Sequence, residues 1–245
     1  MRIRSITLFA QTTVPLDTAA ITSMGQTARA LAAAYTNAGG YEVQTIRFAT
    51  SFLDALPRHA PAEAIVDLTT RLEEACQAAG FDFVSIGPAN VELQPLIPEL
   101  LRSTRSVFVT SPIVRPDGTT IDGEAIRGAA QVIRDAAAID DGFGNLRFAA
   151  TANVKPGTPF FPAAFWTAPR PAFAVATESA DLAEEACRAA ADAAVAHETL
   201  RAAITHHGNR LDAIGAAASH DNGMDYLGVD FSLAPYPGTG VSIGS

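Results

Sequence analysis

The sequence predicts an α/β protein whose mostly parallel sheet is covered by outer helices. Helical patterns separate the strand-like segments almost every time, which is typical of repeated strand–helix–strand units. The segment FDFVSIG at residues 81–87 is short and strongly apolar, as is common for a strand buried on both faces of a parallel sheet. With 245 residues, the chain is long enough to bury a sizeable core, and we expect one domain over residues 1–245.

Six segments have the composition and the alternation of strands. Strands are predicted at residues 2–9, 41–48, 81–87, 106–110, 146–154 and 172–177. The tail from residue 228 is also strand-like before it becomes rich in Gly, Pro and Ser. A pattern of this kind fits either an open doubly wound sheet or part of a closed barrel.

Apolar residues at three-to-four spacing predict the intervening helices. They cover about residues 18–38, 61–80, 93–103, 122–139 and 182–206, and a continuation of the last helix to residue 218 is left open. Asp17 or Thr18 can cap the first helix and Ile121 or Asp122 begins the fourth. His206-His207 would then lie near a helix end.

The composition excludes several classes of partner. A net charge of −9, with arginines spread singly, argues against a surface that neutralises nucleic acid or an anionic membrane. The N-terminal apolar run is too short for a signal peptide, and no run approaches the length that crosses a bilayer, so we expect a cytoplasmic protein. Two distant cysteines, Cys76 and Cys187, are expected to be buried in helices.

Polar side chains recur just after the predicted strands. Asn90 follows the third strand and Arg115 the fourth, Asn153 and Thr158 follow the fifth, and Glu178 follows the sixth. Because α/β sheets and barrels place ligands at strand C-termini, we expect the first four to bind substrate and Glu178 to act as a catalytic carboxylate. The alternative is that Asn153, Thr158 and Glu178 only cap helices, and Thr158-Pro159 is itself typical of a helix start.

The turn between the fifth and sixth strands is dense in proline and aromatic residues and carries the chain's only lysine, Lys155. Phe160 is a candidate wall of a ligand pocket, together with Phe161, Phe165 and Trp166. The alternative is that these aromatic side chains belong to the core.

A second polar segment, SHDNGMDYLGVDFS, covers residues 219–232. It places five possible metal ligands within eleven residues, His220, Asp221, Asn222, Asp225 and Asp230. Their spacing matches no zinc or calcium motif, so we expect no metal site here and leave open a simple polar loop. The segment FAQTTVPLDT after the first strand contains no glycine, which weighs against a nicotinamide cofactor, and the sequence identifies no other cofactor.

Several blocks resemble a known family. They are IRSITLF, YEVQTIRFAT, FDFVSIGPA, NLRFAATANVKPGTPFFPAAF, AFAVATESADLAEEA and GVDFSLAPYP. In this order they are similar to the domain of unknown function 711 family over essentially the whole chain. The resemblance favours Asp230 as a catalytic residue and Ser232 as a substrate-binding residue, because both lie in or beside the FSLAP block.

The resemblance also implies a fold similar to the α/β barrel of pyruvate formate-lyase-like glycyl radical enzymes. Members usually run well beyond the FSLAP block, so we expect either a short variant or a fragment of such a protein. The barrel of a short variant would be open or completed by a second chain. Radical chemistry is not implied. Both cysteines lie in helical patterns, and Gly238-Thr239-Gly240 does not match a glycyl radical loop.

Two functions remain open at this point. The first is an enzyme of unknown reaction that binds a small polar or anionic metabolite at the C-terminal ends of the strands. The second is a non-catalytic binding or assembly subunit. The long Ala-rich helix from residue 182 offers faces suited to subunit contacts, so we expect a homo-oligomer.

Overall fold

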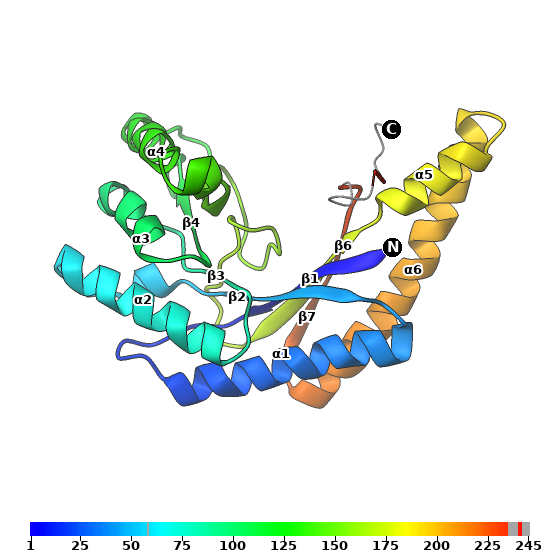
Figure 1. Cartoon of the computed structure of the whole chain (residues 1–245), viewed down its shortest axis with the longest axis horizontal. Helices are drawn as coiled ribbons and strands as arrows, with labels where there is room; N and C mark the ends of the chain where they lie inside the picture. Colours follow the sequence, from blue (N-terminus) through cyan, green and yellow to red (C-terminus); the bar gives the residue numbers. More distant parts are fainter. Residues whose placement is uncertain (58, 235–239, 242–245) are drawn as a thin grey trace.

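The computed structural model describes residues 1–57, 59–234 and 240–241, and it confirms the α/β class. Its strands form one seven-stranded sheet in the order β5-β4-β3-β2-β1-β6-β7 (Figure 1). They are β1 (Arg2–Phe9), β2 (Val43–Ala49), β3 (Phe83–Ser85), β4 (Val107–Pro112), β5 (Phe148–Thr151), β6 (Ala172–Glu178) and β7 (Asp225–Ser232). The helices are α1 (Thr18–Gly39), α2 (Ala62–Ala78), α3 (Ile97–Ser103), α4 (Gly123–Ala136), α5 (Ala180–Ala189) and α6 (Ala193–Asn222). Shorter 3₁₀ helices are η1 (Phe52–Ala55), η2 (Gln94–Leu96) and η3 (Asp140–Arg147).

The sheet is mostly parallel, with one reversal. Strands β1 to β5 run in the same direction, whereas β6 pairs antiparallel with β1 and β7 pairs parallel with β6. In the described part of the chain β5 and β7 remain the two edges, so the curved sheet is a half-barrel and not a closed barrel. This agrees with the predicted partial barrel, while the closer likeness to glycyl radical enzymes stays a prediction.

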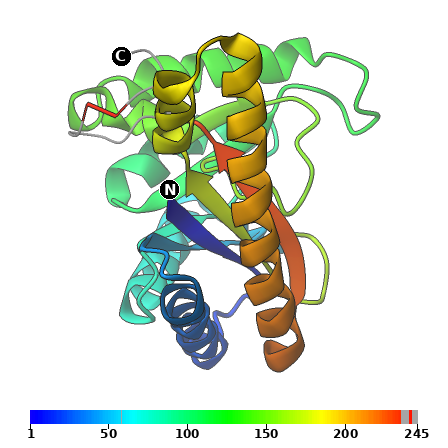
Figure 2. The ribbon, with the colours of Figure 1, turned by 90° about the vertical axis from the view of Figure 1, so that its right-hand side faces the viewer.

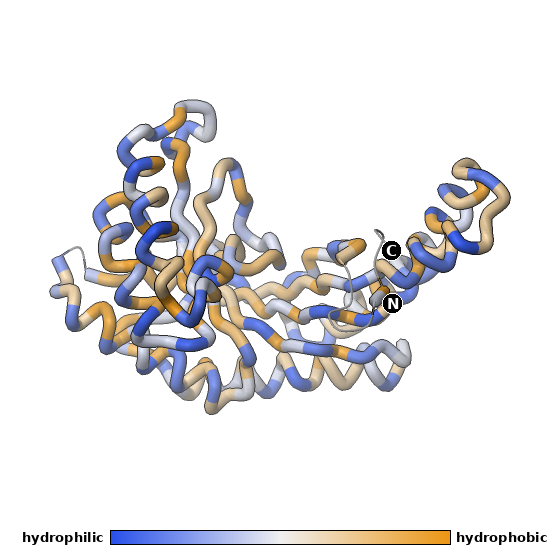
Figure 3. Tube along the Cα trace, turned by 45° about the horizontal axis from the view of Figure 1, so that its top comes forward, coloured by the Kyte–Doolittle hydropathy of each residue, from blue (hydrophilic) through white to orange (hydrophobic). Residues whose placement is uncertain are grey.

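The two faces of the sheet differ in what covers them. Helices lie outside the curved sheet (Figures 1 and 2), and Ile6 and Leu8 of β1 join the large core beneath them. Phe9, which points to the other face, belongs to a smaller cluster with no helical residues in it. Along the helices the hydropathy alternates between blue and orange in Figure 3, as expected when one side of each helix is buried.

The inner face is covered at one end by the turn between β5 and β6. Phe161 and Trp166 are buried against it, and the Trp166 ring centroid lies 5.6 Å from that of Phe9. Ser51 Oγ donates a hydrogen bond to the Trp166 carbonyl at 2.6 Å, and Ser85 Oγ donates to the Ala164 carbonyl at 2.6 Å. Side-chain donors from β3 and from the loop after β2 thus hold this turn against the sheet.

Several predicted helix boundaries are confirmed. Asp17 accepts a hydrogen bond from the Ala20 amide at the start of α1, and Asp122 accepts from the Glu124 and Ala125 amides at the start of α4. The helix α1 ends at Gly40, whose φ of 69° is the left-handed conformation that glycine adopts without strain.

Other predicted boundaries are wrong. Thr158-Pro159 begins no helix, because the chain continues as a turn over the sheet. The helix predicted from residue 182 is two helices, α5 and α6, separated around Asp192, which caps the second. His207 consequently lies in the middle of α6. Cys76 is buried as expected, but Cys187 is exposed.

The predicted polar loop around residues 221–223 is the last turn of α6 and its Gly223 cap. In the described part of the chain, no helix is both long and apolar enough to cross a membrane. The candidate radical loop Gly238-Thr239-Gly240 falls largely outside the described residues.

Candidate functional site

Three of the predicted site residues come together at the C-terminal edge of the parallel strands. Asn90, Arg115 and Asn153 follow β3, β4 and β5, and all three line one pocket of about 380 Å³. The other lining residues are Pro88, Val91, Pro112, Val114, Pro116, Gly118, Asp122, Ala125, Thr151, Val154 and Phe165. The wall is therefore largely apolar, with a few polar groups from three separate loops, which is the usual make-up of a small-molecule site.

The loop after β4 is organised by Asp117. Its carboxylate accepts hydrogen bonds from the Thr119 and Thr120 amides at 2.8 Å and from the Thr120 hydroxyl at 2.7 Å. Chiefly the bonds from Thr120 lower the pKa of Asp117 to about 2. Arg115 is consequently presented on an ordered turn, with its side chain 62% exposed and its Nε 3.9 Å from Asp122 Oδ2.

Asp122 serves as the N-cap of α4. The amides of Ala125 and Glu124 and the nearby Arg115 hold its pKa below the ordinary value. It is therefore an ionised structural carboxylate at neutral pH, which restrains Arg115 loosely and leaves most of the guanidinium facing solvent.

Asn153 occupies a strained position beside this loop. Its φ is 57°, in the left-handed region that asparagine tolerates better than most residues. A Cβ added to Gly118 would lie only 3.2 Å from Asn153 Oδ1, which shows how closely the two loops approach. Asn90 is held differently, because its Oδ1 accepts a hydrogen bond from the Leu93 amide at 3.0 Å.

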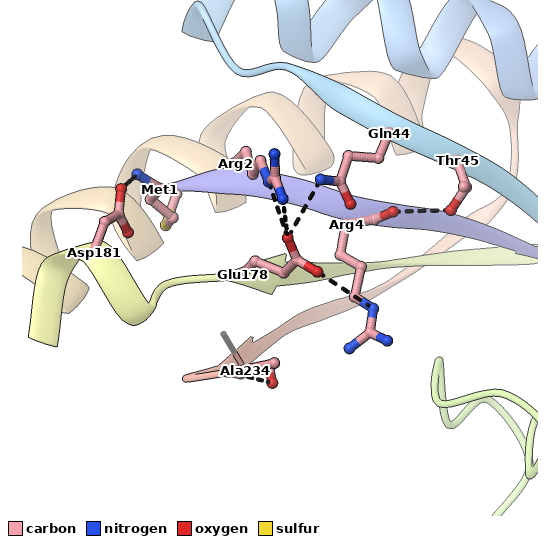
Figure 4. Close-up of polar contacts among 9 residues, drawn as sticks. Met1, Arg2, Arg4, Gln44, Thr45, Glu178, Asp181 and Ala234 are labelled. Atoms are coloured by element: carbon pink, nitrogen blue, oxygen red, sulfur yellow. Dashed lines mark hydrogen bonds and ion pairs between the residues drawn. The ribbon is translucent and has the colours of Figure 1, made fainter. Parts of the chain in front are cut away.

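Glu178 does not join this pocket. Because β6 runs antiparallel to β1, its last residue, Glu178, lies at the opposite end of the strands from the pocket. There it is the register partner of Arg2. Figure 4 shows Glu178 among Arg2, Arg4 and Gln44, with distances of 2.9 Å to Arg2, 3.7 Å to Arg4 and 3.3 Å to Gln44. The buried Glu178 carboxylate is thus engaged in charge pairing with two arginines.

Asp230 and Ser232 lie on the strand next to Glu178 and do not line the pocket. Ser232 is the register partner of Glu178 and Asp230 that of Ala176, so both side chains are on the inner face of the sheet. The Ser232 hydroxyl accepts a hydrogen bond from the Ala234 amide at 3.2 Å. The eight predicted site residues therefore do not form one site.

Thr158 and Phe160 stay in the turn between β5 and β6. Thr158 is partly buried, and Phe160 is 59% exposed, so it is neither a core residue nor among those that line the pocket. The turn bends at Gly157, where φ is 86° and an added Cβ would lie 2.7 Å from Leu227 of β7. Among the described residues, no group of three or more His, Cys, Asp or Glu side chains could hold a metal ion.

Arg47 is a charged residue that the sequence reasoning did not single out. Its guanidinium lies over the rings of Phe161 and Phe83, at 5.3 and 5.6 Å from their centroids. Burial lowers its pKa to about 10, and the neighbouring Arg4 adds to the effect. The alternation of residues in β2 predicts that Arg47 lies on one face of the sheet. It does not predict which of the two faces that is.

These features define a class of protein, an α/β half-barrel. It has a loop-built pocket at the C-terminal ends of the parallel strands and a cluster of charged residues on the inner face toward their N-terminal ends. The chain belongs to the family described as "Uncharacterised ACR (DUF711)", whose model matches residues 1–245. It is 26% identical over 220 residues to a UPF0210 protein of Pyrobaculum islandicum, which covers 83% of this chain and 48% of that protein. A second UPF0210 protein, from Methanopyrus kandleri, is 25% identical over 203 residues, covering 74% and 43%. The chain thus spans about half the length of the curated relatives it matches.

Proposed function

We propose that the protein binds a small anionic metabolite in the pocket at the C-terminal edge of β3, β4 and β5. The observation that carries this proposal is the convergence of Asn90, Arg115 and Asn153 from three loops on one largely apolar pocket. A guanidinium recognises carboxylate and phosphate groups, and the two amides supply further donors and acceptors. The restraining contact to Asp122, at 3.9 Å, is long enough for a ligand anion to replace it.

The pocket supports binding more directly than a reaction. Glu178 and Asp230, the predicted catalytic residues, lie on another part of the sheet. Asp122 already caps a helix, so its carboxylate is committed to backbone amides. We therefore propose ligand binding as the function of this pocket. The enzymatic interpretation adds that the bound metabolite is chemically changed, which NMR spectra of the recovered ligand would detect.

The binding proposal is tested by thermal unfolding against a panel of carboxylates and phosphorylated metabolites. A ligand at one hundred times its Kd stabilises the folded state by about 2.7 kcal/mol. For a chain of this size that corresponds to an increase in Tm of roughly 5–10 °C. Arg115→Gln should weaken binding about tenfold or more, because the charge-assisted contact is lost.

The matched control is Arg134→Gln. It removes the same charge from an exposed position in the last turn of α4, away from the pocket, and should leave the affinity unchanged. The proposal fails if no member of the panel raises the Tm. It also fails if a ligand raises the Tm of Arg115→Gln as much as that of the unmodified chain.

We also propose self-association through the α5–α6 pair. The helix α5 and the start of α6 project beyond the sheet (Figures 1 and 2), and residues 193–195 and 197–199 near the start of α6 are exposed. Val195 is 46% exposed there and offers an apolar contact for a second copy of the chain. Sedimentation velocity should show a dimer or larger that Val195→Asp dissociates, and a monomer at all concentrations would refute this second proposal.

A further inference from the structure

Two buried hydroxyl groups in the middle of the inner face are not used by the fold. Ser5 and Thr7 of β1 have no exposed surface, and neither hydroxyl has a hydrogen-bond partner. Their neighbours Ile6 and Leu8 face the helices, so Ser5 and Thr7 point to the inner side of the half-barrel. Buried hydroxyls are almost always paired in folded proteins, so two unpaired hydroxyls in one strand require an explanation.

The neighbouring strands place small alanines on one side of these hydroxyls and a charged side chain on the other. Thr7 is the register partner of Ala174 on β6 and of Arg47 on β2. Ser5 has Ala176 of β6 on one side. Side chains at such positions are direct neighbours on the same face of a sheet. The hydroxyls therefore lie between small alanines and a long cationic side chain.

Arg47 makes no direct ion pair in the described part of the chain, although Asp82 and Glu178 act on it from a greater distance. Its Nε donates a hydrogen bond to Thr45 Oγ at 3.0 Å. Among the described residues, no carboxylate oxygen lies within the 4.0 Å that would make an ion pair with its guanidinium. A half-buried guanidinium without a carboxylate is a ready partner for an anionic ligand.

The remaining charges on this face are nearly balanced. Arg2 and Arg4 surround Glu178, and Asp230 on β7 is exposed beside Ala176. Asp82 and Glu178 also act electrostatically on Arg47 from beyond ion-pair distance, so three arginines stand against three carboxylates in this region. Glu178 and Asp230 lie toward the other end of the sheet, whereas Arg47 is the register partner of Thr7 on the adjacent strand.

We propose that Ser5, Thr7 and Arg47 form a second binding site, which takes the carboxylate or phosphate group of a small metabolite. The hydroxyls would donate to the ligand oxygens, and the guanidinium would balance their charge. The site is built on the strands β1 and β2, whereas the pocket proposed above is built on the loops after β3, β4 and β5. An anion reaches the hydroxyls only when the side chains packed over them move, so samples should be equilibrated before measurement.

The chain's single tryptophan provides a probe for this site. Trp166 contacts Phe9, which lies two residues beyond Thr7 on the same face. Its fluorescence is titrated with inorganic phosphate and, separately, with malonate, against sodium chloride of equal ionic strength. We expect a saturable change for phosphate, malonate or both, and the more effective anion shows which group the site prefers.

Two variants test the assignment. Thr7→Val keeps the shape of the side chain and removes the hydroxyl, and Arg47→Gln removes the charge. Each should weaken the response about tenfold or more. Arg115→Gln in the loop-built pocket should leave the fluorescence response unchanged. Failure of one binding proposal is therefore distinguishable from failure of the other.

Three outcomes would overturn the inference. A fluorescence change that is not saturable, or absent with both anions, would mean that these residues bind neither anion. An unchanged response in Thr7→Val would show that the anion binds elsewhere, and this variant decides even if Arg47→Gln does not fold. Loss of the response in Arg115→Gln would assign the signal to the loop-built pocket.

Discussion

Asn153 allows the stability of the pocket to be separated from its affinity for a ligand. Its backbone is left-handed, with φ at 57°, and its side chain is exposed at the pocket wall. Replacement by glycine removes the side chain and relieves the strained backbone, whereas replacement by alanine removes the side chain and keeps the strain. The two variants should therefore bind alike and differ in stability.

The size of the difference follows from the conformation. The left-handed region costs an L-residue about 1–2 kcal/mol, and it costs asparagine less than alanine. We expect Asn153→Ala to lower the free energy of unfolding by about 1 kcal/mol and Asn153→Gly to change it by less than about 0.5 kcal/mol. At roughly 2–4 °C per kcal/mol, Asn153→Ala should unfold a few degrees below Asn153→Gly.

The assay is urea unfolding without ligand, followed by titration of each variant with the ligand identified in the panel. Loss of one amide hydrogen bond should weaken binding by about three- to tenfold in both variants. Equal stability of the alanine and glycine variants would refute the strain argument. Unchanged affinity in Asn153→Gly would show that this side chain does not contact the ligand.

Three further predictions concern the sheet and its helices. Ser85→Ala should lower the free energy of unfolding by about 1–3 kcal/mol in urea, because the Ala164 carbonyl loses its buried partner. Glu178→Gln should cost about 1–2 kcal/mol and lose this effect in high salt, since solvent screens the partly exposed arginines around it. Burial chiefly lowers the pKa of His207, so the unfolded chain takes up the proton first as pH falls below the ordinary value near 6.5. Unfolding curves should therefore show stability falling from pH 7 to 5, less steeply in His207→Gln, and a pH-independent result would contradict this.

Much of the fold could be predicted from local patterns. Periodicity placed six of the strands and most of the helices, and the acidic caps Asp17 and Asp122 marked two helix starts correctly. The convergence of Asn90, Arg115 and Asn153 also followed from the rule that parallel strands share one edge. These successes rest on interactions within one segment or on a general rule of sheet geometry.

The remainder depends on contacts that the sequence does not encode locally. Nothing in the segment AFAVATE of β6 distinguishes a parallel from an antiparallel strand, and this choice moved Glu178 away from the pocket. Thr158-Pro159 suits a helix start and an extended turn equally well, and packing on the sheet selects the turn. Ser5 and Thr7 alternate as any strand residues do, so only the assembled sheet shows that their hydroxyls are buried.

The reversal of β6 also bears on how such a protein can be modified. The loops that build the pocket leave the sheet at one end, and the connection from β6 to α5 leaves it at the other. Insertions or exchanges in the loops after β3, β4 and β5 should therefore alter the ligand without disturbing α5 and the start of α6. Exchanges confined to the exposed start of α6 should conversely leave the pocket intact, since the core residues Leu211 and Ala218 come later in that helix. The half-barrel thus offers two ends that selection or an engineer can vary independently.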